Sequence, residues 1–435
     1  MASFPPEGFV QVASNVDGID VYAPAPEMPE SEPDVVDFAC PRCQATTAYS
    51  VEDGGLRCAH CGYYEPPAMP TVGKGAQEFE FTVVTVAAAR QAQGWGTDRR
   101  ELQCEQCGAR TSVPPGDLTH TCPFCSSNRV LQQTSAQEQL RPRFLVPFQV
   151  DQAACKRIAA AWIGASWMSP SALKGNGRLV EFTGVYMPYW TFDARTAADW
   201  RAQVGHTETE RYYDSGSKSW KTRTKTVWRW ESGHARQVFD DHLAPASTRF
   251  SELLLGRIQA FDTRALVPYA PSYLAGLMAH AYDVALDDGW ESAREAMRDG
   301  TRQACRAQAS TRQIRNFSMS LDFSDESWRY VLMPVYVAAY AYDGETYQVL
   351  VNGQTGAIAG QRPVDWTKVW LAVGGMLAPG VLLGLMGVLA SVLGAVLPPT
   401  VAAGGLVVVV ALVLLVIGIV LAAVTLTKAR GMDDV

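Results

Sequence analysis

The C-terminal part of the chain is dominated by two long apolar runs. Residues 369–397 and residues 401–426 contain no charged side chain, and only a Pro-Pro-Thr segment separates them. Each run exceeds the roughly 20 residues that a helix needs to cross the core of a bilayer. Because so short a link allows only an antiparallel return, the pattern predicts a two-helix transmembrane hairpin. We expect the first helix to tilt, or to kink at Pro379, and to offer a small-residue face at Gly380 and Gly384.

Residues 141–363 combine strand-like and helix-like patterns of apolar positions. Alternating, β-branched and aromatic runs predict strands at 144–150, 182–194, 200–206, 317–323, 330–342 and 346–352. Helical patterns predict a helix that begins after the N-cap residue Asp151, and two more at 272–283 and 289–309. This order of elements favours one α+β domain with a largely antiparallel sheet.

Two segments of this domain resemble each other. YMPYW at 186–190 and LMPVY at 332–336 each lie in a predicted strand that follows a helix-containing stretch. Two similar half-units that share one sheet would explain the likeness, and so would coincidence.

The N-terminal 37 residues differ in composition from the rest. They contain eight acidic residues, six prolines and neither Lys nor Arg. Such a segment cannot bury a core, so we expect residues 1–37 to form a disordered acidic tail. Residues 67–100, between the two cysteine-rich segments, are expected to form a linker with a short helix within 79–93.

Eight of the ten cysteines form two constellations with the same C-x2-C-x14-C-x2-C pattern. Two C-x2-C pairs can supply four thiolates that surround Zn²⁺ as a tetrahedron. A closed site of this kind stabilises a small fold and has no open position for catalysis. We therefore predict zinc ribbons at 38–66 and 101–132 that hold two structural Zn²⁺ ions. The predicted ligands are Cys40, Cys43, Cys58, Cys61, Cys104, Cys107, Cys122 and Cys125. The remaining Cys155 and Cys305 are expected to be buried thiols.

The basic residues around the apolar runs predict an orientation. Arg362 and Lys368 precede the first run, Lys428 and Arg430 follow the second, and the link between the runs carries no charge. By the positive-inside rule both ends of the hairpin are cytoplasmic, with residues 427–435 as a cytoplasmic tail. The start of the chain lacks the features of a signal peptide, and paired cysteines in a reducing compartment favour metal binding. We expect a multi-pass membrane protein whose N-terminal domains are cytoplasmic.

A basic stretch at 220–230 (WKTRTKTVWRW) alternates as a strand does. Its basic face would contact anionic lipid headgroups, or alternatively nucleic acid. The competing interpretation is a solvated hairpin whose tryptophans lie in the core. The residues of this candidate surface are Lys221, Arg223, Lys225 and Arg229. A net charge of −7 and ribbons without a basic stripe make nucleic acid the less favoured partner.

No motif of a known enzyme class is present. The sequence contains no phosphate-binding loop with Lys followed by Ser or Thr, no H-E-x-x-H and no G-x-S-x-G. The spacing of His234, Asp240, Asp241 and His242 matches no metal site, so we interpret these residues as surface groups. We predict a protein that is not an enzyme, and we identify no small-molecule substrate.

The order of the parts resembles a bacterial family of membrane-anchored twin zinc-ribbon proteins, whose members are often described as primosomal helicase-like or TFIIB-type zinc ribbon proteins. The resemblance rests on the paired four-cysteine patterns, RPRFLVPFQV, GVYMPYWTFDA, VNGQTG and the terminal hairpin. Some family members lie in operons with phage-shock protein A-like and flotillin-like proteins, which implies a recruiting or scaffolding role. The absent nucleotide-binding motifs disagree with the helicase label. Only the eight ribbon cysteines can be transferred from the family to this chain.

These expectations combine into one functional hypothesis. The protein is expected to be a membrane-anchored zinc-ribbon adaptor that recruits partner proteins to the cytoplasmic face of the inner membrane, in envelope stress or membrane maintenance. The alternative is a membrane-tethered nucleic-acid-binding protein that uses the ribbons and the strand at 220–230.

Overall fold

A computed structural model gives the fold of most of the chain. It describes residues 9–12, 21–24, 38–66, 71–76, 78–81, 100–104, 110–113, 130–133, 140, 142–171, 182–248, 250, 252–343, 345–393 and 399–433. The described part is a mixed α+β structure with a large antiparallel sheet, a cluster of four cysteines and two apolar C-terminal helices.

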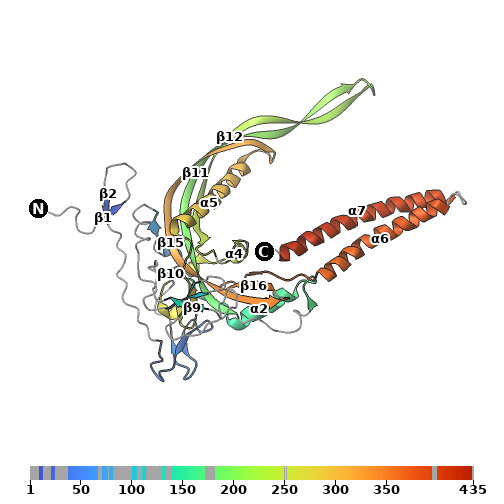
Figure 1. Cartoon of the computed structure of the whole chain (residues 1–435). Helices are drawn as coiled ribbons and strands as arrows, with labels where there is room; N and C mark the ends of the chain where they lie inside the picture. Colours follow the sequence, from blue (N-terminus) through green and yellow to red (C-terminus); the bar gives the residue numbers. More distant parts are fainter. Residues whose placement is uncertain are drawn as a thin grey trace.

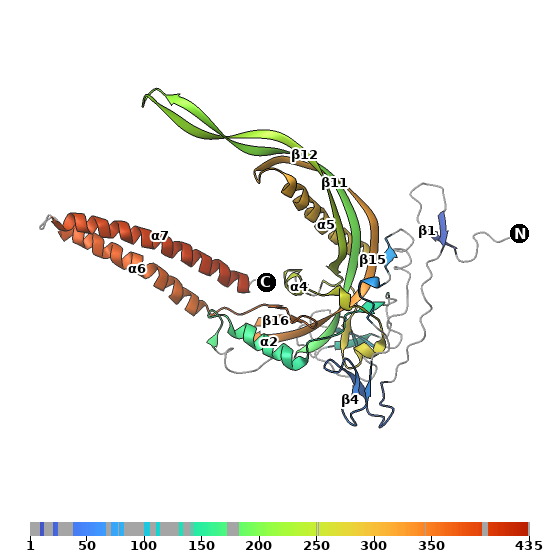
Figure 2. The same cartoon turned by 180° about the vertical axis from the view of Figure 1, so that it is seen from behind.

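Three very long strands form the centre of the molecule. β11 (Thr183–Asp214) pairs antiparallel with β12 (Ser219–Pro245) on one side and with β15 (Ile314–Tyr342) on the other. Figures 1 and 2 show these strands curving away from the body of the molecule. The strands expected at 182–194 and 200–206 are therefore one strand, as are those expected at 317–323 and 330–342.

The centre of the sheet has an approximate two-fold arrangement. Met187 lies opposite Met333, so the two similar segments of the sequence are antiparallel neighbours. β10 (Phe144–Leu145) runs parallel to β15, and β14 (Met278–His280) runs parallel to β11. Each short strand is followed by a helix and two longer strands, β10 by β11 and β12, and β14 by β15 and the eight-residue β16 (Glu345–Asn352). The chain thus contains two β-α-β-β units that exchange their first strands within one sheet.

The helices of the two units differ in length. α2 (Gln152–Gly164) begins after Asp151, whose side chain accepts a hydrogen bond from the backbone N–H of Ala154, as the N-cap prediction requires. α5 (Leu286–Gln308) carries Asp287 and Asp288 in its first turn, where the helix dipole favours negative charge. Its buried side chains recur at helical spacing and pack on β11 and β12.

Both faces of the central sheet are buried, which explains why its strands are continuously apolar there. Tyr186 and Trp190 point to the face covered by α2 and α5. Met187 and Tyr189, one position along, point to the opposite face, which is covered by α4 (Glu252–Ile258). Cys155 and Cys305 are both fully buried, as expected.

Short elements complete the edges of the sheet. β16 (Glu345–Asn352) pairs with β15 and with β17 (Ile358–Gly360). β13 (Val267–Pro268) pairs with β10, and β6 (Phe79–Glu80) pairs with β15. Short 3-10 turns lie at η1 (Gly73–Gly75), η2 (Thr263–Ala265) and η3 (Pro271–Leu274).

Three local expectations differ from the structure. The helix expected at 272–283 is replaced by η3 and β14, because this segment pairs with strands from other parts of the chain. The helix expected within 79–93 begins instead as strand β6, and residues 82–93 lie outside the described part. Within the expected disordered tail, β1 (Phe9–Val12) and β2 (Val21–Pro24) form an antiparallel pair.

The C-terminal hairpin consists of two long apolar helices. α6 (Trp366–Leu393) contains Pro379, and α7 (Pro399–Asp433) continues through most of the segment expected to be a tail. Both are long and apolar enough to cross a membrane, and only 17% of each apolar window is buried in the structure. Large apolar side chains such as Leu371 and Leu406 are exposed, whereas those of a soluble core helix would be covered.

Gly380 lies at the contact between the two helices, as the small-residue prediction requires. A Cβ atom at Gly380 would meet the backbone N of Leu415 at 2.8 Å, whereas one at Gly384 would meet the side chain of Ala411 at an ordinary 3.7 Å. The contact also uses Gly387 and Gly418, which the sequence analysis did not single out.

Candidate metal centre

The first four-cysteine cluster lies on a three-stranded antiparallel sheet. β3 (Thr47–Ser50) pairs with β4 (Gly55–Cys58), which pairs with β5 (Tyr64–Glu65). One pair of cysteines precedes β3; of the other pair, Cys58 ends β4 and Cys61 lies between β4 and β5. The hairpin therefore returns the second pair to the first, as the spacing predicts.

Both cysteine pairs lie in tight turns of the same kind. The N–H of Gln44 donates to the carbonyl of Cys40 at 2.8 Å, and the N–H of Gly62 donates to the carbonyl of Cys58 at 3.0 Å. Gly62 has a positive φ of 70°, and Gln44 occupies the equivalent place with a φ of 60°. A non-glycine residue in this conformation is uncommon, and the local sequence does not predict it for Gln44.

The sulfur atoms have the separations of a tetrahedral site. The Sγ atoms of Cys40 and Cys61 are 3.4 Å apart, and those of Cys43 and Cys58 are 3.6 Å apart. Four bonds of about 2.3 Å to Zn²⁺ in a tetrahedron place the sulfurs about 3.8 Å from one another. All four ligand atoms lie within 4.8 Å of one another. This group could hold one metal ion.

The pKa values of the four thiols are shifted by their neighbours, and these shifts bear on whether the cluster holds a cation. The backbone N–H of Cys61 lowers the pKa of the Cys58 thiol to about 6. The backbone N–H of Ala45 lowers the pKa of Cys43, but burial and the sulfurs of Cys61 and Cys58 outweigh it and raise that pKa. Adjacent thiolates repel one another, and a bound cation would remove this repulsion.

The cluster is fixed to the body through the segment that contains η3. The N–H of Tyr49, on β3, donates to the carbonyl of Ala275 at 3.0 Å, and the ring centroids of Tyr49 and Tyr273 are 5.3 Å apart. Gly276 has a φ of 75°, and a Cβ atom there would lie 3.2 Å from Cβ of Ala48. The four-cysteine unit is therefore attached to the body by direct contacts.

The second cysteine set is described only in part. Cys104 is buried at the end of β7 (Arg100–Cys104), which pairs with β8 (Arg110–Val113) and β9 (Val130–Gln133). Cys107, Cys122 and Cys125 lie outside the described residues, so the second predicted zinc site stays a prediction. β8 also pairs with β14, which joins this unit to the main sheet.

The predicted basic face at 220–230 lies on the outer part of the β11–β12 hairpin. Each of its basic residues pairs with an acidic residue on β11, so the face carries less free charge than its sequence implies. The pairs are Lys221–Asp214, Arg223–Glu210, Lys225–Glu210 and Arg229–Glu208. The tryptophans of this strand are not in a core, because 64% of Trp220 and 51% of Trp230 are exposed.

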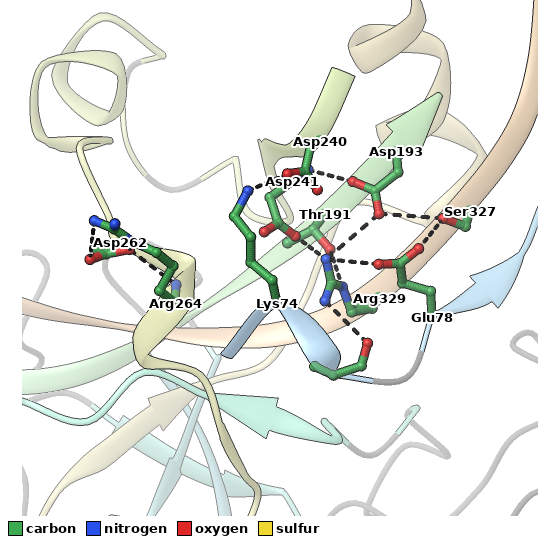
Figure 3. A network of polar contacts seen from close by, with 11 residues as sticks. Lys74, Glu78, Thr191, Asp193, Asp240, Asp241, Asp262, Arg264, Ser327 and Arg329 are labelled. Atoms are coloured by element: carbon green, nitrogen blue, oxygen red, sulfur yellow. Dashed lines mark hydrogen bonds and ion pairs between the residues drawn. The ribbon is translucent and has the colours of Figure 1, made fainter. Parts of the chain in front are cut away.

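A buried ionic network lies where the long hairpin leaves the body (Figure 3). Its centre is Arg329 on β15, of which 2% is exposed. The guanidinium pairs with Asp241, reaches Glu78 Oε1 at 3.3 Å, and lies 3.6 Å from Asp193 Oδ2. The network therefore joins β15, β11, β12 and the segment before β6.

Asp241 belongs to the acidic side of this network and is buried, so the interpretation of Asp241 as a surface residue was wrong. Only 4% of its side chain is exposed, its φ is 58°, and one of its carboxylate oxygens has no hydrogen-bond partner among the described residues. The register of β11 against β12 shifts beside it, which turns Asp241 inward. Alternating patterns in sequence cannot locate such a bulge.

The carboxyl group of Asp193 has a raised pKa in this network. Burial, together with the neighbouring Glu78, raises the pKa of Asp193 to about 7. One oxygen each of Asp193, Asp240 and Asp241 lies within 4.8 Å of the others, but Arg329 and Lys74 already pair with all three of these residues. We interpret the group as an ionic connection between elements.

Comparison with known proteins gives one curated relative at low identity. The chain is 23% identical over 341 residues to YdjG of Bacillus subtilis (strain 168), an uncharacterized protein, and the match covers 77% of this chain and 92% of the relative. No family model matches the chain, and no solved structure matches it.

Proposed function

We propose that this protein is a non-enzymatic adaptor of a bacterial inner membrane. α6 and α7 anchor it with both ends on the cytoplasmic side, and the four-cysteine units present docking surfaces to partner proteins. The observation that carries the proposal is the combination of a closed four-sulfur cluster with a hairpin whose apolar side chains are exposed. A closed site organises a surface without reacting, and the hairpin places that surface at a membrane.

The arrangement of the molecule supports this assignment. In Figure 2 the unit that contains β4 lies at the end of the body away from α6 and α7. A partner could therefore reach this unit while the helices are in a bilayer. By the family resemblance stated above, phage-shock protein A-like coat proteins and flotillin-like scaffolds are the proposed partners, and envelope maintenance is the proposed setting.

Co-purification from native membranes tests the adaptor. The tagged full chain is compared with Cys58→Ala, which removes a predicted zinc ligand, and with Cys155→Ala, which removes a buried thiol that does not belong to the cluster. We expect the wild type and Cys155→Ala to retain coat or scaffold proteins after nuclease treatment. Cys58→Ala should lose one zinc ion per chain and the partner, while it stays in the membrane.

Two outcomes would contradict the proposal. Unchanged zinc content in Cys58→Ala would remove the metal assignment. Recovery of mainly nucleic acid, with partners that disappear after nuclease treatment, would favour the membrane-tethered nucleic-acid-binding protein instead.

A further inference from the structure

The outer part of the β11–β12 hairpin has no core of its own. β15 pairs with β11 only as far as the Val204–Ile314 pair, and beyond it β11 and β12 pair with each other alone up to Asp214 and Ser219. We call residues 205–228 the arm and residues 211–223 the arm tip. A two-stranded hairpin is marginal in water unless its side chains pack on something, so the length of the arm needs a physical reason.

The arm tip exposes aromatic side chains. Trp220 is 64% exposed and Tyr213 is 54% exposed, and their ring centroids lie 5.6 Å apart. Arg211 lies 5.9 Å from the Trp220 ring, and Arg223 lies 5.3 Å from the ring of Tyr212. Large exposed aromatic groups of this kind usually mark an interaction surface.

The charge of the arm tip opposes that of the whole chain. Residues 211–223 contain four basic side chains and one acidic side chain, whereas the whole chain has a net charge of −7. Asp214 pairs with Lys221, and among the described residues Arg211 and Lys218 form no ion pair. Their positive charges are therefore available to an anionic partner.

The position of the arm indicates which partner this is. In Figures 1 and 2 the arm and the α6–α7 hairpin extend from the same side of the body. The base of the helices is held to the body, because the N–H of Arg362 donates to the carbonyl of Met432 at 3.1 Å and Lys368 Nζ donates to the carbonyl of Ser169 at 2.9 Å. The arm and the helical hairpin therefore project toward the same side of the molecule.

We propose that the arm tip binds the anionic headgroup region of the bilayer that α6 and α7 cross. Tryptophan and tyrosine favour the membrane–water interface, and basic residues beside them attract anionic lipid. With a second attachment point, the body cannot rotate freely about the helical hairpin, and the four-cysteine unit stays directed away from the membrane. This inference rests on the proposed membrane anchoring and goes beyond it.

Photocrosslinking in lipid nanodiscs tests the contact. A benzophenone amino acid replaces Trp220 in the full chain, and a matched control places it at Val238, which lies nearer the body on β12 and is 70% exposed. The discs contain phosphatidylcholine alone or phosphatidylcholine with phosphatidylglycerol, and a single-stranded oligonucleotide is added as competitor. We expect lipid adducts at position 220 to exceed those at position 238 by roughly tenfold in the anionic discs.

Charge reversal identifies the electrostatic part of the contact. Lys218→Glu combined with Lys221→Glu should lower the yield of lipid adducts at position 220 by about tenfold or more, since each basic residue near an anionic surface contributes attraction. The control pair, Arg195→Glu with Arg302→Glu, also reverses two exposed positive charges and should leave the yield unchanged.

Three outcomes would overturn the proposal. Equal lipid adducts at positions 220 and 238, or adducts that do not depend on anionic lipid, would remove the specific contact. Adducts with the oligonucleotide in preference to lipid would assign the arm tip to nucleic acid. Failure of the full chain to enter the discs would overturn the anchoring as well, which separates that result from a failure of the arm alone.

Discussion

Arg329 carries a positive charge into the most buried part of the sheet, where it must have partners. Its guanidinium pairs with Asp241, lies near Glu78 and Asp193, and also donates from Nε to Thr191 Oγ1 at 3.2 Å. Burial of one such charge is tolerated only while these contacts exist. The buried carboxylates around Arg329 depend in turn on its positive charge.

Arg329→Met is therefore expected to be strongly destabilising. It removes the ion-pair partner of the buried Asp241 side chain, and a loss of about 3–5 kcal/mol is typical of a broken buried pair. Arg195→Met is the matched control, because the Arg195–Asp325 pair is exposed and worth about 1 kcal/mol or less. Chemical denaturation of the detergent-solubilised chain, followed by tryptophan fluorescence, measures both. Equal losses of unfolding free energy in the two variants would show that the buried network stabilises the fold no more than an exposed ion pair does.

The raised pKa of Asp193 predicts a dependence of stability on pH. Its pKa rises from an ordinary 3.8 to about 7 in the folded state, chiefly through burial. Between these values the folded chain binds a proton that the unfolded chain lacks, so this group's contribution to stability is present at low pH and is lost as pH rises through about 7.

Asp193→Asn removes this titration and keeps the shape of the side chain. The variant should lose less stability than the wild type when pH rises from about 5 to about 8, and thermal unfolding at both pH values measures the difference. Asp325→Asn, at an exposed carboxylate, is the control and should follow the wild type. A variant whose slope equals that of the wild type would contradict the role given to Asp193.

At the scale of elements, the helical hairpin depends on close approach of two backbones. A Cβ atom at Gly380 would lie 2.8 Å from the backbone N of Leu415, which belongs to α7 and cannot move without shifting that helix. Gly374, on the same helix, has open space around it. The two glycines therefore differ in packing although both lie in one apolar helix.

Gly380→Ala is expected to separate α6 from α7 at this contact and to destabilise the hairpin by about 1–3 kcal/mol, the usual cost of overpacking. Gly374→Ala should be neutral or slightly stabilising, because alanine favours the helix. Thermal unfolding in detergent, or resistance to proteolysis at the hairpin, distinguishes the two. Similar results for both variants would exclude a close-packed hairpin.

At the scale of the whole molecule, the proposed orientation places the body on the cytoplasmic side. The basic residues that flank the two apolar runs are at the body end of the hairpin, and the link between the runs has no charge. Protease added to intact spheroplasts should leave the body undigested, and lysis should expose it to cleavage. Cleavage of the body without lysis would reverse the orientation.

The sequence determined the elements whose physical cause is local. The uncharged runs gave the two apolar helices, the Asp151 side chain gave the start of α2, and the spacing of the first four cysteines gave their cluster. In each case neighbouring residues supply the driving force: continuous apolar surface, a capping hydrogen bond, or turns that return two cysteine pairs to one point.

Only the tertiary structure decided features that depend on distant partners. Residues 272–283 have an apolar pattern that suits a helix, but the edges of β11 and β8 recruit part of them as strand β14. The two similar segments became neighbours because the half-units share one sheet, with Met187 opposite Met333. The bulge that buries Asp241 beside Arg329, and the extension of the arm beyond β15, follow from strand register, which local preference does not specify.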